Sequence, residues 1–328
     1  MKRDLNLDSL KGILILMVVI GHIPFGNFFV EKPGIMIDFI KWFYFFHMSL
    51  FFSISVLFIK KDFDWIIKRA AIILTPYLFW FFYGHKLLLF QNPIYFIEKL
   101  FIGNWGSLNS IIWFLPALFS LNLIFYIFYK SSNVLQCFIF GISILTFLFA
   151  KQIAFFHYYI PFGIDIAFYI FILTFLIQKI YKNQEKYTFI KFHWLLILIT
   201  LSSCFLFYFE PIKRHTQWLE IIDLAQYSVT ETFLGYISFI ILNISLFILF
   251  LKLKPIKIMI LLGRYSFPIF LLHLIVLYKI PTYLNGVIEK SGFTPLIISF
   301  LFSIIIPIIA SKILMKISVK FKYIGMAE

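Results

Sequence analysis

Charged residues and cysteine are both scarce in this sequence, and each shortage excludes a class of protein. Lys, Arg, Asp and Glu make up 13% of the 328 residues, whereas a soluble domain contains about 25%. The two cysteines, Cys137 and Cys204, both lie within apolar runs, so neither a disulfide framework nor the spacing of a metal site is present. We therefore expect a chain with a largely apolar surface and no bound metal.

Long apolar runs fill the chain instead. Hydrophobic residues make up 62% of the sequence and aromatic residues 22%, and a membrane-spanning helix needs about 20 predominantly apolar residues. The sequence predicts an all-α, polytopic membrane bundle of about ten transmembrane helices, at residues 10–28, 39–59, 70–90, 111–129, 133–150, 160–179, 192–209, 233–251, 258–279 and 294–315. Because the polar segments between them are short, we expect one integral-membrane domain over residues 1–328 and no separate soluble domain.

The formal charge of +14 is unevenly distributed along the chain. The expected spans place about 20 Lys and Arg but only 6 Asp and Glu on the side of the two termini, against 9 of each kind on the other side. Positive residues collect in the cytoplasmic loops of membrane proteins, so both termini are expected in the cytoplasm. Topology thus explains the basic character of the chain, and the expected partner is a lipid bilayer and not nucleic acid.

Three histidines fall inside the expected spans, where an ionisable side chain costs about 2.5–3.5 kcal/mol on insertion. His22 lies in the first span, His47 in the second and His273 in the ninth. A rise of about 1.5 Å per residue puts His22 about 16 Å from the cytoplasmic side and His47 about 12 Å below the outer surface, with His273 at a similar level. We interpret them as parts of one polar cavity. The alternative is that each makes a single hydrogen bond between helices and only stabilises the bundle.

Four basic residues lie near the cytoplasmic ends of three spans. Lys11 and Arg264 each precede one of these histidines in the same span, and Lys68 and Arg69 lie at the start of the third span. Guanidinium and ammonium groups pair well with phosphate, so the four residues form a candidate clamp for the phosphates of a nucleotide-like donor. For each of these basic residues taken alone, the simpler explanation is that its side chain anchors the helix at the membrane surface.

Several short motifs, taken in order along the chain, resemble one known family. They are L-D-S-L-K-G at 7–12 with V-V-I-G-H at 18–22, F-H-M-S-L-F-F at 46–52, K-R at 68–69, P-Y at 76–77, W-F-L at 113–115, and L-G-R-Y-S at 262–266 followed by His273. Together they resemble the acyltransferase-3 family of integral-membrane O-acyltransferases, in the branch similar to fucose 4-O-acetylase, over nearly the whole chain. Two departures lie in the second span: Ser49 stands where that branch commonly has proline, and Val56 follows Ser55 where glycine is frequent.

The resemblance implies the transfer of an acyl group, usually acetyl from cytoplasmic acetyl-CoA, to a hydroxyl of a carbohydrate or lipid-linked glycan on the far side of the membrane. The expected location is the inner membrane of a bacterium, with a role in modifying the cell envelope. Many relatives carry an additional soluble domain that completes the transfer. Since none is expected here, the chain would act alone or with a separate partner.

A sugar hydroxyl is a poor nucleophile at neutral pH, and a histidine with an ordinary pKa of about 6.5 can take its proton. We expect His22 to be this general base, or else to carry the acyl group covalently before the acceptor receives it. His47 and His273 are expected to support it by orienting His22, polarising the thioester carbonyl or binding the acceptor. Trp113 is a candidate for stacking on a sugar ring, although tryptophans at the membrane interface usually act as anchors.

Two other classes of protein also place ionisable residues inside the membrane. A transporter or flippase of a glycan or small solute uses them as proton relays and substrate paths, but the sequence has no clear inverted repeat and no paired broken helices. A glycan-handling scaffold with purely structural histidines is the third candidate. The sequence leaves open the acceptor sugar, the acyl chain length and the formation of a homo-oligomer.

Overall fold

The computed structural model describes residues 3–23, 39–40, 42–102, 110–149, 160–187, 190–208, 229–284, 293–318, 320, 323 and 325–326. All regular structure in these ranges is helical. The α-helices are α1 (Leu5–Gly21), α3 (His47–Val56), α4 (Phe63–Gln91), α5 (Pro93–Ile102), α6 (Phe114–Lys130), α7 (Asn133–Leu148), α9 (Ile164–Lys182), α10 (Phe192–Tyr208), α11 (Val229–Lys252), α12 (Lys257–Arg264), α13 (Ser266–Leu284) and α14 (Phe293–Ile317). The short 3₁₀ helices are η2 (Ser110–Trp113), η4 (Pro161–Gly163) and η5 (Gln184–Tyr187).

Several helices are long and apolar enough to cross a membrane. By length and hydropathy there are 5 among the described residues, in α4, α6, α9, α11 and α14, and up to 6 if the bent pair α12–α13 is one span. Large apolar side chains face outward from them, such as Phe90 at 84%, Ile313 at 53% and Phe233 at 48% exposure. Because soluble monomers do not expose apolar surface of this extent to water, the chain is a polytopic integral-membrane protein.

Each of the ten segments expected to cross the membrane contains a helix, but several helices are shorter than a full span. The described helices at Trp42–Val56, Asn133–Leu148 and Phe192–Leu206 have between 10 and 17 residues. The sequence does not predict α5, which directly follows α4. The all-α membrane bundle is thus confirmed, whereas the number of ten full spans stays a prediction.

Helix α1 begins before the predicted start at residue 10. The Asp4 carboxylate caps it by accepting hydrogen bonds from the backbone N–H groups of Asn6 at 2.9 Å and Leu7 at 3.2 Å. An Asp at this position satisfies N–H groups that have no partner within the helix. The cap extends α1 into the polar N-terminal segment, so the helix carries charged residues at one end and a histidine at the other.

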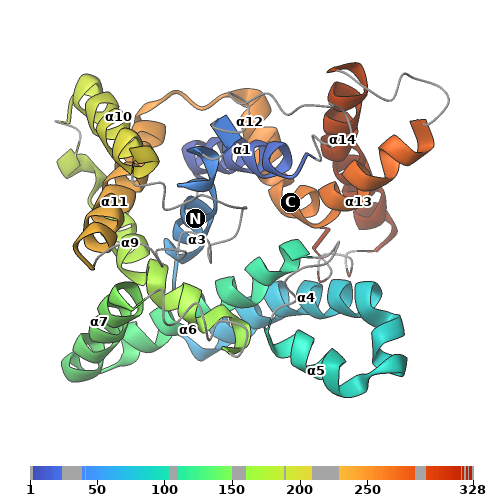
Figure 1. The fold of residues 1–328 in the computed structure, drawn as a ribbon, viewed down its shortest axis with the longest axis horizontal. Coiled ribbons are helices and arrows are strands. Elements are labelled where there is room, and N and C mark those ends of the chain that lie inside the picture. Colours follow the sequence, from blue (N-terminus) through green and yellow to red (C-terminus); the bar gives the residue numbers. More distant parts are fainter. Residues whose placement is uncertain are drawn as a thin grey trace.

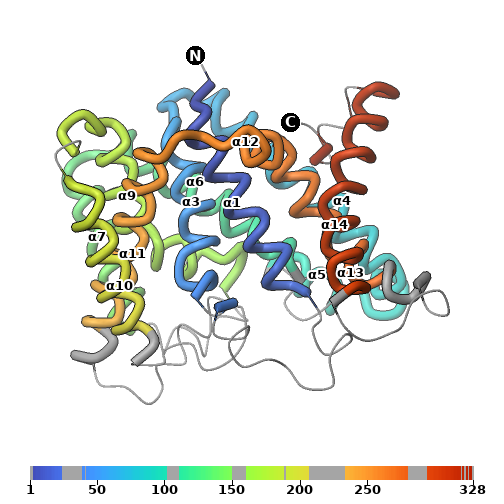
Figure 2. Tube along the Cα trace, turned by 90° about the horizontal axis from the view of Figure 1, so that it is seen from above, coloured from blue at the N-terminus to red at the C-terminus, as the bar shows by residue number. Residues whose placement is uncertain are grey.

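The ninth expected span, residues 258–279, is broken into two helices. Helix α12 ends at Arg264, α13 begins at Ser266, and the two are bent by 78°. Pro268 lies in the first turn of α13, where its missing N–H removes no helical hydrogen bond, so a new helix can start there in a new direction. As a result, α12 lies across one end of the bundle while α13 runs down into it (Figure 2).

Helix α1 lies at the meeting point of the two halves of the chain. Five of its side chains are at most 1% exposed: Leu10, Leu14, Ile15, Val18 and Val19. It contacts α3, α11, α12, α13 and α14, which join segments far apart in the sequence (Figure 1). In Figure 2, α1 begins and α14 ends on the same side of the molecule.

Candidate functional site

A cavity of about 790 Å³ opens between α1, α3, α4, α6, α9 and α13. Three basic side chains, Arg3, Lys11 and Arg69, and two acidic ones, Asp4 and Asp8, line it. Most of the other lining residues are apolar: Leu7, Met48, Phe51, Ile54, Phe58, Ile72, Ile73, Phe114, Leu118, Phe267 and Phe270. The cavity therefore offers charged groups at the N-terminal end of α1 and an apolar wall over the rest of its length.

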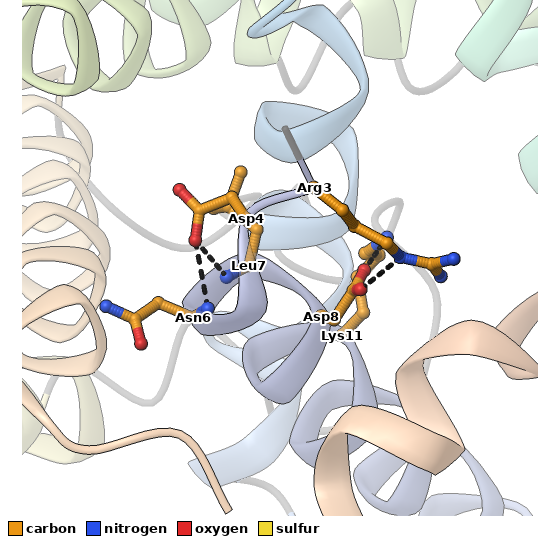
Figure 3. Close-up of polar contacts among 6 residues, drawn as sticks. All are labelled: Arg3, Asp4, Asn6, Leu7, Asp8 and Lys11. Carbon is orange, nitrogen blue, oxygen red and sulfur yellow. Dashed lines mark hydrogen bonds and ion pairs between the residues drawn. The ribbon is translucent and has the colours of Figure 1, made fainter. Parts of the chain in front are cut away.

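The first turns of α1 hold the charged side chains in place (Figure 3). The Asp8 carboxylate pairs with Lys11 Nζ at 2.8 Å and with Arg3 Nε. Asp8 precedes the apolar part of α1; burial raises the pKa of its carboxyl, but the hydrogen bonds and charges of Lys11 and Arg3 outweigh burial and hold this pKa below its ordinary value. Asp8 is therefore ionised at neutral pH and fixes both cations at the cavity wall.

The four basic residues predicted to bind the donor are not all in one place. Lys11 and Arg69 line the cavity, but Lys68 and Arg264 do not. Lys68 is exposed on another face of α4. Arg264 is partly buried at the end of α12, and its Nε has no hydrogen-bond partner in the described part of the chain. Arg3, which the sequence does not single out, takes a place at the cavity.

Arg69 is the basic residue of the cavity that is not paired with a carboxylate among the described residues. Its Nη2 donates to the backbone carbonyl of Ser55 at 3.4 Å, and its guanidinium carbon lies 5.2 Å from the ring centroid of Trp65. The stacked indole and the long hydrogen bond orient the guanidinium. An anion in the cavity can thus approach Arg69 without displacing a carboxylate.

Close backbone contact between α1 and α12 explains two glycines of the sequence motifs. A Cβ atom on Gly12 would lie 1.9 Å from the carbonyl oxygen of Met259, and one on Gly263 would lie 1.8 Å from that of Asp8. Small residues allow helix backbones to approach this closely. The contact sets the position of α1, including its cavity-lining residues, against the helix that ends in Arg264.

The three predicted histidines come from three helices that meet beyond the cavity. His22 caps the C-terminus of α1, His47 is the first residue of α3 and His273 lies within α13. The ring centroids of His22 and His273 are 5.2 Å apart in an edge arrangement. His47 and His273 are fully buried. Helix α1 contacts both α3 and α13, so the tertiary structure gathers these residues around the end of α1.

One type of hydrogen bond fixes the tautomer of all three imidazoles. Nδ1 lies 2.7 Å from the backbone carbonyl one turn earlier in His22 and in His47, and 2.8 Å from the nearer of two such carbonyls in His273. Because a carbonyl only accepts, Nδ1 carries the proton and Nε2 carries the lone pair. Nε2 of His273 is buried without a hydrogen-bond partner in the described ranges. The site therefore presents basic imidazole nitrogens.

Tyr44, which the sequence does not single out, connects the ends of α1 and α3. Its hydroxyl donates to the Gly21 carbonyl at 2.9 Å, and its ring centroid lies 4.9 Å from that of His47. A Cβ atom on Gly21 would lie 2.5 Å from the hydroxyl oxygen, so the glycine before His22 makes room for Tyr44. In a chain with 18 tyrosines, one more carries no distinct sequence signal.

A second buried contact holds the start of α3. The Ser49 hydroxyl donates to Oδ1 of Asn243 in α11, and Nδ2 of Asn243 donates to the Phe45 carbonyl at 3.0 Å. Both side chains are fully buried. Ser49 thus connects α3 to α11 two residues after His47. The signal that could have identified this contact is an amide inside the apolar run 233–251.

Trp113 lies in the core. It is 7% exposed, and its ring centroid is 6.5 Å from that of Phe52 and 6.2 Å from that of Phe114. Neither Trp113 nor the three histidines line the cavity. Phe270 does line it, and its ring centroid is 6.4 Å from that of His273. Phe270 therefore connects the wall of the cavity with His273.

A family model described as an acyltransferase domain, that of acyltransferase family 3, matches residues 4–312. The matched range includes all three histidines and nearly the whole chain, and it does not distinguish one branch of the family from another. The chain matches no curated protein and no solved structure.

Proposed function

Because the chain belongs to the acyltransferase 3 family, we propose that this membrane acyltransferase transfers an acetyl group from acetyl-CoA to a hydroxyl of a sugar or lipid-linked glycan. The observation that carries the proposal is the course of α1 from Lys11 at the cavity to His22 beside His273. His22 follows Lys11 by eleven positions, which is about three helical turns, so both side chains leave the helix on the same face, about 16 Å apart.

The cavity has the chemistry that such a donor needs. A volume of about 790 Å³ lies within the range of roughly 300–1,000 Å³ typical of ligand pockets. Arg3, Lys11 and Arg69 can pair with phosphates, and the apolar wall suits the less polar arm that bears the thioester. Asp8 neutralises part of the charge, so phosphates at Arg3 and Lys11 would take over its place as their ion-pair partner.

His22 is the proposed general base. Its Nε2 takes the proton from the acceptor hydroxyl, whose oxygen then bonds to the carbonyl carbon of the thioester. The carbon–sulfur bond breaks, and the departing thiolate receives the proton held by His22. His273, edge-on to His22, and His47, held beside Tyr44, are the proposed positioning residues for acceptor and carbonyl.

The deciding experiment measures transfer of radiolabelled acetyl from acetyl-CoA to lipid-linked glycan by the purified protein in nanodiscs. We expect His22→Ala to lower the rate about 10²–10⁴-fold, the usual contribution of a general base. His193→Ala, which changes an exposed histidine, is the matched control and should retain the rate. If His22→Ala transferred acetyl at the wild-type rate and the purified protein bound no coenzyme A, the proposal would be wrong.

A covalent route differs from this one by a single intermediate. In that route Nε2 of His22 bonds to the acyl carbon, the carbon–sulfur bond breaks and the thiolate leaves with the Nδ1 proton; the acceptor oxygen then bonds to the acyl carbon as its bond to Nε2 breaks, and the hydroxyl proton returns to the imidazole. Incubation with radiolabelled acetyl-CoA but no acceptor separates the two. Label retained on the wild-type protein and absent from His22→Ala supports the covalent route, and the absence of label from both supports direct transfer.

We also propose that residues 1–328 form one domain of ten spans in the inner membrane of a bacterium, with both termini in the cytoplasm. The excess of Lys and Arg on the side of the termini supports this topology. In a variant without Cys137 and Cys204, Lys320→Cys should react with a membrane-impermeant maleimide only after permeabilisation. Glu98→Cys, an exposed position in α5, should react in intact cells. The reverse pattern would invert the topology.

A further inference from the structure

A layer of aromatic rings in the cavity wall lies next to the histidines. Phe51, Phe114 and Phe270 line the cavity, whereas His22 and His273 do not. The ring centroids of Phe114 and Phe270 are 5.3 Å apart, and those of Phe51 and Phe114 are 6.4 Å apart. The ring centroid of Phe270 also lies 6.4 Å from that of His273, which is 5.2 Å from that of His22.

The layer is built from three different helices. Phe51 comes from α3, Phe114 is the first residue of α6 and Phe270 lies in α13. Phe114 and Phe270 are buried, at 7% and 6% exposure. Rings at these separations are in direct edge or tilted contact, so a group can pass between them only when a side chain rotates. The gap that such a rotation opens is limited by the size of the ring that moves.

We propose that Phe114 and Phe270 form a constriction that lets a short, acetyl-sized acyl group reach His22 and holds longer acyl chains back in the cavity. The inference rests on the proposed function, since it assumes that the acyl donor occupies the cavity. To the proposed function, the inference adds the two residues that select the acyl group by its length. The constriction also keeps water in the charged part of the cavity away from the reacting thioester.

The test compares acyl-CoA donors of increasing chain length with variants that widen the layer. Phe270→Ala removes the ring next to His273, and Phe270→Leu and Phe114→Leu are milder changes that keep an apolar side chain. We expect the ratio of kcat/KM for hexanoyl-CoA to that for acetyl-CoA to rise about tenfold or more, because a misfit of one methylene in a tight pocket is worth about 10–200-fold.

Phe128→Leu is the matched control. Phe128 is a buried residue of α6, at 4% exposure, and packs among Phe140, Phe171 and Phe175 away from the cavity. Its change removes aromatic packing without touching the constriction. We expect its preference for acetyl-CoA to equal that of the wild type, which separates chain selection from a general loss of packing.

Hydrolysis of acetyl-CoA without acceptor is the second readout. In that reaction the oxygen of water bonds to the carbonyl carbon, the carbon–sulfur bond breaks and the proton of water ends on the thiol. Phe270→Ala should raise the rate several-fold over the wild type and over Phe128→Leu, since water then reaches the thioester. Radiolabelled acetate released per minute measures it.

The outcomes separate the two proposals. If the wild type transfers acetyl and both leucine variants fold, as judged by gel filtration and thermal melting, an unchanged chain preference and unchanged hydrolysis overturn the constriction alone. If the wild type shows no transfer that depends on acetyl-CoA, the proposed function fails and the constriction with it. A shift to hexanoyl-CoA in the Phe270 and Phe114 variants, but not in Phe128→Leu, supports both.

Discussion

At the scale of single residues, the hydroxyl of Tyr44 holds the end of α1 that carries His22. Tyr44→Phe removes the hydrogen bond of 2.9 Å to the Gly21 carbonyl and keeps the ring beside His47. A buried hydrogen bond contributes about 1 kcal/mol, and about 1.4 kcal/mol corresponds to tenfold in rate. We therefore expect kcat to fall about fivefold, with KM for acetyl-CoA unchanged, in steady-state assays.

Tyr83→Phe is the control for this prediction, because the Tyr83 side chain is 60% exposed. It should leave both kinetic constants unchanged. A rise in KM for acetyl-CoA with constant kcat in Tyr44→Phe would show that the hydroxyl acts on donor binding and not on the position of His22.

The ion pairs of Asp8 predict how stability depends on pH. The folded pKa of Asp8 is lowered, so its ionised form stabilises the protein above the unfolded pKa of about 3.9, and this stabilisation is lost as the pH falls through the folded pKa. Asp8→Asn should lower the melting temperature at pH 7. On acidification below about pH 4, the melting temperature of Asp8→Asn should fall less than that of the wild type. Melting curves in detergent between pH 3 and 7 measure it.

Asp64→Asn, at an exposed position in the first turn of α4, is the control. We expect its melting temperatures to follow those of the wild type. If the melting temperature of Asp8→Asn were lower than that of the wild type by the same amount at every pH, the stabilisation would not come from the charge of Asp8.

At the scale of helices, the contact of α1 with α12 depends on two glycines. A methyl group on Gly12 would lie 1.9 Å from the Met259 carbonyl oxygen, so Gly12→Ala must push the helices apart. Overpacking of this kind costs about 1–3 kcal/mol. Gly141→Ala is the matched control, since nothing lies within 4 Å of its added Cβ. Melting temperatures should fall for Gly12→Ala and stay constant or rise for Gly141→Ala.

The contact between α3 and α11 gives a further prediction at this scale. Asn243→Ala removes the hydrogen bonds that the amide makes to the Phe45 carbonyl and to the Ser49 hydroxyl, and two buried hydrogen bonds together contribute about 1–3 kcal/mol. Because Ser49→Ala breaks part of the same contact, the double variant should lose less stability than the two single losses added together. Melting curves of the three variants measure this coupling, and strict additivity would show that the two side chains act independently.

At the scale of the whole molecule, the fold places a cavity with charged residues and a group of histidines at opposite ends of one buried helix. Apolar side chains cover the outside, as membrane lipid requires. The bend between α12 and α13 lets α12 cross one end of the bundle, where Gly263 meets α1, while α13 continues to His273. The cavity and the histidines are therefore joined through packed helices from both halves of the chain.

The sequence by itself determined what depends on neighbours along the chain. Apolar runs of span length predicted the helices, the motifs around Lys11 and His22 predicted the family, and the spacing of these two residues follows from the helical repeat alone. Even so, the sequence did not predict that α1 starts before residue 10 or that the ninth expected span breaks at Arg264. The Asp4 cap and Pro268 change only where a helix begins, and they leave the apolar runs unaltered.

Only the tertiary structure decided which side chains meet. Lys68 and Arg69 are adjacent in sequence, yet only Arg69 lines the cavity, because successive residues point about 100° apart and the rotation of α4 is set by packing. The contacts of Tyr44, of Asn243 and of the rings between cavity and histidines each join separate helices. Hydrophobicity and helix propensity are local properties, and they carry no information about which faces of distant helices come together.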